Sequence, residues 1–103
     1  MSYRYPATQG QRDSNEAEII NALEAVGATV EQMVTGSGVP DLLVGYKDIN
    51  YLMEVKPLPV KGKVFASQVA LNKKQVIWHW YWKGQKAVVR TSEEALALIG
   101  IKA

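Results

Sequence analysis

The sequence predicts a single domain of the α/β class, more closely of the α+β kind, in which a central mixed β-sheet is flanked by helices. Its 103 residues, 48% of them hydrophobic, suffice for one domain that buries a core. Segments with helical spacing of apolar residues and short apolar runs follow one another in the order α-β-β-β-α-β-α. We place this domain at residues 13–103 and expect residues 1–12, which show no periodicity, to form a flexible N-terminal arm.

The first helix is expected over residues 14–26. Asp13 or Ser14 can cap its N-terminus, with Glu16 supporting Asp13 three residues later. Gly27 follows the last periodic residue, where glycine commonly ends a helix. The apolar positions between these ends recur at helical spacing: Ile19, Ile20, Leu23 and Val26.

The next three apolar runs are expected to be strands, at residues 28–34, 41–46 and 51–56, with a break at 35–38. Residues 47–50 resemble a four-residue turn, so the second and third strands should form an antiparallel hairpin. A symmetric turn would place Asp41 opposite Lys56 and Leu43 opposite Glu54. Asp41 and Glu54 would then be diagonal neighbours on one face, roughly 7 to 8 Å apart, and Lys56 would share that face. A slip by one residue would move Asp41 to the other face.

The second half of the chain begins with Pro57 and Pro59, which end the third strand because proline cannot donate to a ladder. Residues 60–70 are expected to form a long loop. Asn72 is a predicted N-cap, with Gln75 as its capping-box partner, for a helix that runs to about residue 82. A short strand at 85–90 and a helix at 92–99, capped by Thr91 with Glu94, complete the order.

The second helix is rich in aromatic residues and apolar nearly all round. We therefore expect it to be buried on more than one side, either filling the core or forming part of a subunit interface. Base stacking is the least favoured use of its aromatic residues. These are Trp78, Trp80, Tyr81 and Trp82. His79 lies among them and is expected to be structural.

Charge is distributed unevenly along the chain, although the net charge is only +2. No Asp or Glu occurs between Val55 and Ser92, and the remainder of the chain carries a charge of −6. Such a segment suits a surface that meets phosphates, with accidental clustering on a solvated surface as the alternative. Its basic residues are Lys56, Lys61, Lys63, Lys73, Lys74, Lys83, Lys86 and Arg90.

Composition excludes several classes of site. The chain has no Cys and one His, so disulfides and a usual zinc centre are excluded, and any metal must be held by oxygen. No apolar run approaches the roughly 20 residues of a membrane span, and the N-terminus lacks the apolar region of a signal peptide. We expect a cytoplasmic protein with no membrane association and no organic cofactor; if a phage encodes it, the cytoplasm is that of the host.

The residues best suited to chemistry are Asp41, Glu54 and Lys56. Two carboxylates that face one point suit a hard divalent cation, and a nearby Lys can polarise a phosphate or activate a water. Each residue alone has a plainer explanation: a strand-initiating turn for Asp41, a salt bridge for Glu54 and a lysine at a strand end for Lys56. On one face together, they indicate phosphodiester hydrolysis.

The segment Gly38-Val39-Pro40-Asp41, followed by Glu54-Val55-Lys56, resembles the Pro-Asp…Glu-x-Lys motif of the PD-(D/E)XK nuclease superfamily. Within that superfamily the chain most resembles the virus-type replication-repair nuclease domains (VRR-NUC), relatives of the archaeal Holliday junction resolvases. The likeness extends over most of the chain. It includes the segments at residues 13–19, 75–79, 87–90 and 93–96.

The resemblance implies a restriction-endonuclease-like core in which Asp41 and Glu54 bind Mg²⁺ or Mn²⁺ with help from the Val55 backbone carbonyl. Lys56 would orient or activate the attacking water. It also points to Gln75 and to an acid on the first helix. Gln75 can serve the capping box as well. Glu18 is the proposed helix acid and Glu16 the competing one, and Glu18 has an alternative role as a first-turn acid favoured by the helix dipole.

The expected function is therefore a Mg²⁺- or Mn²⁺-dependent, structure-selective DNA endonuclease that acts on branched or four-way junction DNA in replication, repair or recombination. A homodimer is expected, since a symmetric junction needs two cuts. The alternative is a non-catalytic nucleic-acid-binding module in a replication or repair assembly. The expected DNA-contacting residues are Arg12, Lys61, Lys63, Lys73 and Lys74.

Overall fold

The computed structural model describes residues 15–59 and 70–102. The expected arm at 1–12, the predicted caps Asp13 and Ser14, and nearly all of the expected loop at 60–70 lie outside these residues. Within them the predicted order α-β-β-β-α-β-α is confirmed. The elements are α1 (Glu16–Ala25), β1 (Thr29–Gln32), β2 (Leu42–Tyr46), β3 (Ile49–Val55), α3 (Lys73–Tyr81), β4 (Ala87–Val89) and α4 (Ser92–Leu98).

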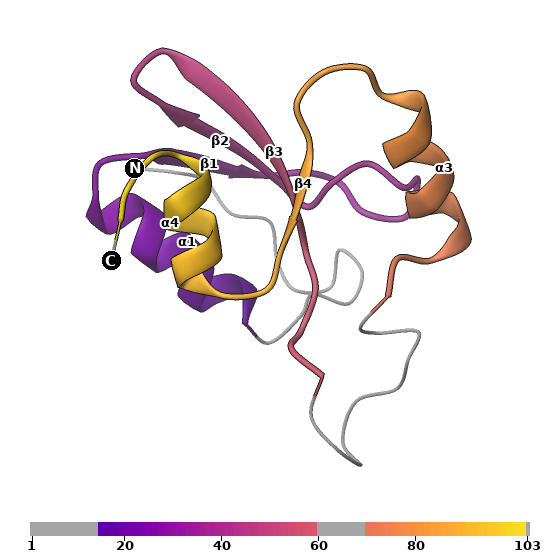
Figure 1. The fold of residues 1–103 in the computed structure, drawn as a ribbon, viewed down its shortest axis with the longest axis horizontal. Helices are drawn as coiled ribbons and strands as arrows, with labels where there is room; N and C mark the ends of the chain where they lie inside the picture. Colours follow the sequence, from indigo (N-terminus) through magenta and orange to yellow (C-terminus); the bar gives the residue numbers. More distant parts are fainter. Residues whose placement is uncertain (1–14, 60–69, 103) are drawn as a thin grey trace.

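The four strands form one sheet in the order β1-β2-β3-β4 (Figure 1). β1 and β2 pair antiparallel, as do β2 and β3, whereas β3 and β4 pair parallel. The predicted mixed sheet of an α+β domain is therefore confirmed. In residues 15–59 and 70–102, no helix has both the length and the apolar character required to cross a membrane.

The hairpin between β2 and β3 differs from the expected one in its turn. Only Lys47 and Asp48 form the loop, and both have positive φ, 51° and 67°, as a two-residue type I′ turn requires. The expected four-residue turn was wrong because Ile49 already pairs with Tyr46. The register shifts by two residues as a result. Since side chains alternate with a period of two, an even shift leaves every side chain on its predicted face.

One face of the sheet carries the core. Register places Val30 beside Val44, Leu42 beside Met53, and Val55 beside Val89, and all six are buried. Helices α1 and α4 contact each other and cover this face. They contribute Ile19, Ile20, Leu23, Ala95 and Ile99 to the core.

The start of α1 is fixed against the ends of two strands. Its N-cap is Asn15, whose side-chain amide donates to the backbone carbonyls of Lys56 (3.2 Å) and Arg90 (2.8 Å). The helix therefore begins two residues later than expected and ends one residue earlier. These contacts hold α1 beside the last residues of β3 and β4.

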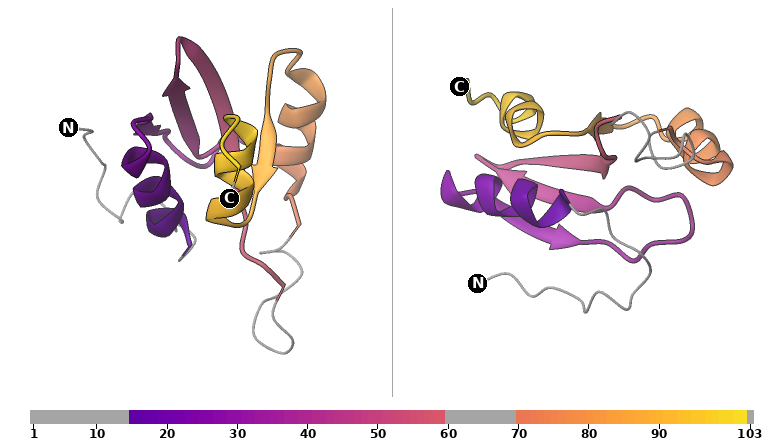
Figure 2. Two further views of the ribbon diagram at one scale, coloured as in Figure 1. Left: turned by 60° about the vertical axis from the view of Figure 1, so that its left-hand side comes forward. Right: turned by 90° about the horizontal axis from the view of Figure 1, so that it is seen from below.

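Helix α3 lies on the other side of β4 from α1 and α4 (Figures 1 and 2). None of its residues is buried. The expectation that this helix is buried on more than one side was therefore wrong. Its apolar character is directed outward because the sheet face under α1 and α4 is already filled by side chains from those two helices.

Candidate functional site

Asp41 and Glu54 lie on neighbouring strands at one end of the sheet. Leu42 pairs with Met53, so the next position along the hairpin brings Asp41 across from Glu54. The expected diagonal relation is thus replaced by a direct one, in which side chains come closer together. The Val55 backbone N–H donates to Asp41 Oδ2 at 2.8 Å. This bond holds the Asp41 carboxylate at the end of β3.

Glu54 and Lys56 are buried charged residues, 1% and 7% exposed. They are two positions apart on β3 and its continuation, where the Lys56 N–H bonds to the Val89 carbonyl at 3.1 Å. Both therefore lie on the face opposite the core residues Met53 and Val55. Acids and lysines are almost never so buried without compensating contacts. A carboxylate and an ammonium held here at such a cost indicate a built polar site.

Gln75 links the first turn of α3 to Glu54. Its side-chain Nε2 donates to Glu54 Oε2 at 3.0 Å. Its Oε1 accepts from the Asn72 N–H at 2.9 Å, and its own N–H donates to Asn72 Oδ1 at 2.9 Å. The predicted capping box is confirmed, and the same side chain contacts Glu54. The cap fixes the Gln75 rotamer, which in turn orients the carboxylate.

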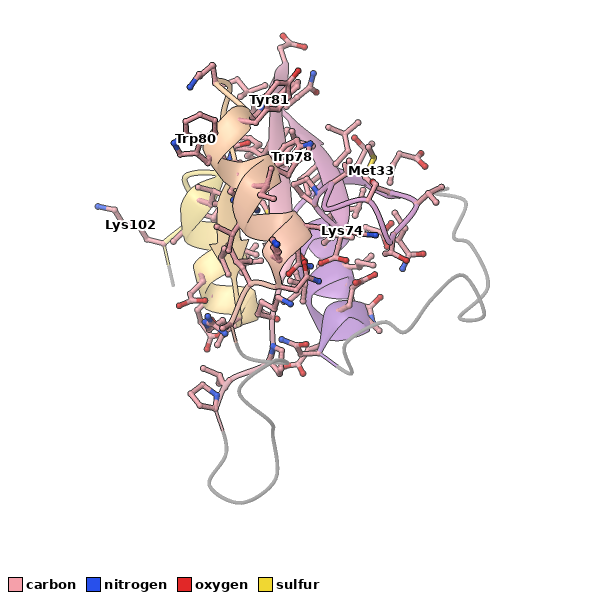
Figure 3. The ribbon with its side chains drawn as sticks, turned by 90° about the vertical axis from the view of Figure 1, so that its right-hand side faces the viewer. Met33, Lys74, Trp78, Trp80, Tyr81 and Lys102 are labelled. Atoms are coloured by element: carbon pink, nitrogen blue, oxygen red, sulfur yellow. The ribbon has the colours of Figure 1, made fainter. Side chains whose placement is uncertain are left out.

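The loop between β1 and β2 packs against α3 at Gly38. A Cβ at this position would lie 2.5 Å from the Lys74 carbonyl oxygen, and Gly38 has φ +94°. Lys74 also donates through Nζ to the Gly36 carbonyl at 3.2 Å; Figure 3 shows Lys74 on the side of α3 near this loop. Sequence reasoning missed this role. Gly38 belongs to the motif that places Asp41, and it also docks the helix that carries Gln75.

The two candidate acids of α1 lie in different surroundings. Glu16 is 2% exposed, and its Oε2 accepts from the side chain of Gln32 at 2.7 Å. Glu18 is exposed and borders a separate cavity of about 170 Å³ beside the start of α4. The sequence did indicate that Glu16 is buried, because Glu16 stands on the same helical stripe as Ile19, Ile20 and Leu23. Nothing in the sequence indicated that the side chain of Gln32 would bind Glu16.

Three acids do not gather around one point in the described part of the chain. Within residues 15–59 and 70–102, no group of three or more His, Cys, Asp or Glu side chains could hold a metal ion. Asp41 and Glu54 come together, and neither Glu16 nor Glu18 forms a group of three with them. Mg²⁺ is commonly bound through one or two carboxylates, with waters and substrate phosphates as the other ligands. Two carboxylates and the Val55 carbonyl are all oxygen donors, so this set fits such an ion.

The expected DNA-contacting lysines are only partly described. Lys73 and Lys74 are exposed in the first turn of α3, directly before Gln75. They stand at a helix N-terminus, where the helix dipole and the backbone N–H groups favour anions. Arg12, Lys61 and Lys63 lie outside the described residues. The described part thus places two lysines in the same helical turn as the residue that contacts Glu54.

His79 stands four residues after Gln75 and therefore on the same side of α3. Its ring meets that of Trp78 edge-on, with the centroids 5.5 Å apart. Burial lowers the pKa of His79 below its ordinary value, and the positive charge of Lys86 lowers it further. His79 therefore behaves as a neutral packing residue of α3.

These observations define a class: an α+β protein with an acid pair, a buried lysine and a helix-borne glutamine at one end of a mixed sheet. No family model, curated protein or solved structure matches the chain. The likeness to VRR-NUC domains therefore stays a prediction that depends on the motif residues.

Proposed function

We propose that this chain is a Mg²⁺- or Mn²⁺-dependent DNA endonuclease with a PD-(D/E)XK core of the VRR-NUC type. One observation carries the proposal: buried Glu54 lies across from Asp41, and buried Lys56 shares its face of the sheet. Carboxylates repel a phosphate backbone unless a cation lies between them. A site that keeps two of them beside a lysine is therefore suited to a metal ion and a phosphodiester.

Each residue has a distinct task in this proposal. Asp41 and Glu54 hold the metal with the Val55 carbonyl, and the ion when bound polarises the phosphate and lowers the pKa of a water. The Val55 N–H keeps Asp41 oriented, and Gln75 keeps Glu54 oriented. Neither carboxylate then has to reorganise as substrate enters.

Lys56 supplies positive charge where negative charge develops. Lys56 is 7% exposed as a whole residue, so its attraction to a phosphate is screened less than that of a lysine on an open surface. In this position it stabilises the charge on the phosphate or orients the attacking water. A neutral side chain of similar length, as in Lys56→Met, would keep the packing and lose that charge.

The proposed substrate is branched or four-way junction DNA, cut by a homodimer. The acid-free segment from Lys56 to Thr91 supports contact with a phosphate backbone. Lys73 and Lys74 flank the site on α3, and Arg12, Lys61 and Lys63 are the further contacts that we propose. The alternative is a nucleic-acid-binding module without catalysis, which would use the same basic residues.

The test is cleavage of labelled linear, flap and four-way DNA with and without Mg²⁺ or Mn²⁺. We expect cleavage only with metal, and a loss of about 10³-fold in Asp41→Asn and Glu54→Gln, equivalent to several kcal/mol of transition-state stabilisation. Asp48→Asn and Glu31→Gln, which neutralise exposed acids elsewhere, are the matched controls. Undiminished cleavage by Glu54→Gln would exclude this site, and binding without metal-dependent cleavage would favour the non-catalytic module.

The same assay resolves the choice between the helix acids. Glu16 is buried and hydrogen-bonded to Gln32, whereas Glu18 is exposed. We therefore expect Glu16→Gln to lower metal-dependent cleavage more than Glu18→Gln does. A larger loss of cleavage in Glu18→Gln than in Glu16→Gln would identify Glu18 as the helix acid of the site.

A further inference from the structure

The outer face of α3 exposes large apolar side chains that the fold leaves uncovered. Trp80 is 77% exposed and Tyr81 65% exposed, although tryptophan is usually well buried. Figure 3 shows both beside the last turn of the helix, at the end remote from Lys74. Exposed apolar patches of this kind mark interaction sites in soluble proteins. The patch consists of Val76, Ile77, Trp80, Tyr81 and Trp82.

Positive charge surrounds the aromatic end of this patch. Lys83 Nζ lies 5.2 Å from the centroid of the Trp80 ring, within the range of a cation–π contact. Lys86 Nζ donates to the Trp82 carbonyl at 2.6 Å and so stays beside the end of the helix. The sequence has no acid between Val55 and Ser92. The patch thus joins aromatic faces to ammonium groups without neighbouring carboxylates in its own segment.

Two aromatic rings at the patch contact each other. Trp78 and Trp82 stack on each other, with their centroids 5.2 Å apart and their planes 13° from parallel. Residues 80–84 line an open groove of about 480 Å³, a volume within the range of ligand pockets. The stacked Trp78–Trp82 pair thus lies beside an open groove whose lining includes the exposed rings of Trp80 and Tyr81.

From these contacts we infer that the C-terminal half of α3 binds unpaired bases of a single-stranded nucleic acid. Bases stack on Trp80 and Tyr81, and Lys83 contacts the adjacent phosphate. Every base presents a π-face, so stacking of this kind is tolerant of sequence, and lysines beside the rings follow the backbone. The inference goes beyond the proposed cleavage, because binding of bases needs neither metal nor chemistry.

A second copy of this chain is the competing occupant, and charge argues against it. A two-fold interface places the same patch of each copy against the other. Lys83 and Lys86 would then approach their own counterparts, and the patch segment has no acid to pair with them. A phosphate backbone supplies the missing negative charge. The predicted homodimer would have to form through another surface.

The patch lies on the same short helix as Gln75, the residue that contacts Glu54. Trp80 follows Gln75 by five residues, about 7.5 Å along the helix axis at the usual rise. The same five residues turn the helix by about 140°, so Trp80 and Gln75 project from different sides of α3. The stacking surface is therefore separate from the proposed cleavage site.

The test compares two labelled oligonucleotides of equal length in EDTA, which prevents metal-dependent cleavage. One is oligo-dT, and the other carries abasic sites, with the same phosphates and no bases. We expect the wild-type chain to bind oligo-dT more tightly. Trp80→Ala should weaken binding of oligo-dT by about 5- to 100-fold and leave the abasic strand unaffected, whereas Trp80→Phe should keep most of the preference. Ile49→Ala, a truncation of an exposed apolar residue on β3, is the matched control.

Two outcomes would overturn the inference. Equal binding of the two oligonucleotides by the wild type would show that only phosphates are recognised. A stable dimer in sedimentation that Trp80→Ala dissociates would show that a second copy covers the patch. Because no cleavage is measured, failure of the nuclease proposal would leave this result unchanged. Circular dichroism of each variant confirms that it is folded.

Discussion

The two sides of the sheet follow opposite rules of burial. Under α1 and α4, apolar side chains of all four strands meet those of two helices, and the innermost positions are closed to water. Toward α3, the residues Glu54 and Lys56 are buried while Trp80 and Tyr81 are exposed. The first arrangement lowers the free energy of folding and the second raises it. Packing of apolar side chains therefore explains the first side, whereas on the second side the burial of Glu54 and Lys56 and the exposure of Trp80 do not follow from packing alone.

The two sides also differ in how their helices are attached. α1 and α4 share one core with the sheet. The described contacts of α3 are mainly polar or steric: Gln75 to Glu54, Lys74 to Gly36, and the close passage of Gly38. A helix with so little buried apolar surface opens at lower free energy than the core does. The arrangement of the site can therefore change without unfolding of the protein.

The largest effect on stability is expected in the core. Leu23 is 0% exposed, so Leu23→Ala should lower the free energy of unfolding by about 2 to 5 kcal/mol through lost burial and a cavity. Trp80→Ala, which removes a larger but exposed side chain, should stay within about 0.5 kcal/mol of the wild type. Urea denaturation measures both. A large destabilisation by Trp80→Ala would show that α3 is part of the core.

The next effect concerns the docking of α3. Gly38→Ala places a methyl group against the Lys74 carbonyl at a position of positive φ, and we expect it to displace α3. Gly36→Ala is the matched control, since Gly36 also has positive φ but nothing within 4 Å of the added carbon. Each should pay about 1 to 3 kcal/mol of backbone strain. Only Gly38→Ala should accelerate hydrogen exchange in α3, and equal exchange in the two variants would contradict the steric contact.

A smaller effect separates the two capped helices. Asn72 Oδ1 caps α3, and the Thr91 hydroxyl caps α4 by accepting from the Glu94 N–H at 3.1 Å. Substitution by Ala should cost each helix about 1 kcal/mol. Thr91→Ala should lower the midpoint of global unfolding, because α4 belongs to the core. Asn72→Ala should leave that midpoint nearly unchanged and increase exchange in α3 alone; a lowered midpoint would contradict independent opening of α3.

Local features of the fold were predictable because local chemistry determines them. The caps at Asn72 and Thr91 are set by side chains within three residues, and both were found from the sequence. The hairpin turn was not, since Lys47-Asp48 lacks the Asn-Gly or Asp-Gly pair that usually identifies a type I′ loop. Even so, the shared face of Asp41 and Glu54 was predicted, because the error in register was even.

Features that depend on tertiary contacts were not predictable in this way. A helix pattern shows which residues are apolar but not whether a neighbour covers them, so the exposure of Trp80 had no local signal. The contact of Gly38 with Lys74 joins segments far apart in sequence. Glu16 was the exception, because its place on the apolar stripe of α1 indicated its burial from the sequence alone.

The smallest expected effect is the response of α3 to acid, through His79. Its folded pKa lies below the ordinary value of about 6.5, chiefly because burial disfavours the charged ring. The unfolded state therefore binds a proton more readily, so the free energy of opening rises with pH in this window. The contribution of neutral His79 is fully present above pH ~6.5 and is lost as the pH falls through the lowered pKa.

Hydrogen exchange of α3 between pH 7 and 5, corrected for the intrinsic rate, should therefore show opening that becomes easier as the pH falls. His79→Gln removes the titrating group and should flatten this dependence. Lys86→Gln removes the second cause of the lowered pKa and should shift the transition to higher pH, toward 6.5. Core amides of α1 should not share the response, because His79 belongs to the helix outside the core. A parallel response in α1 would mean that the two sides of the sheet open together, which would remove the difference between them.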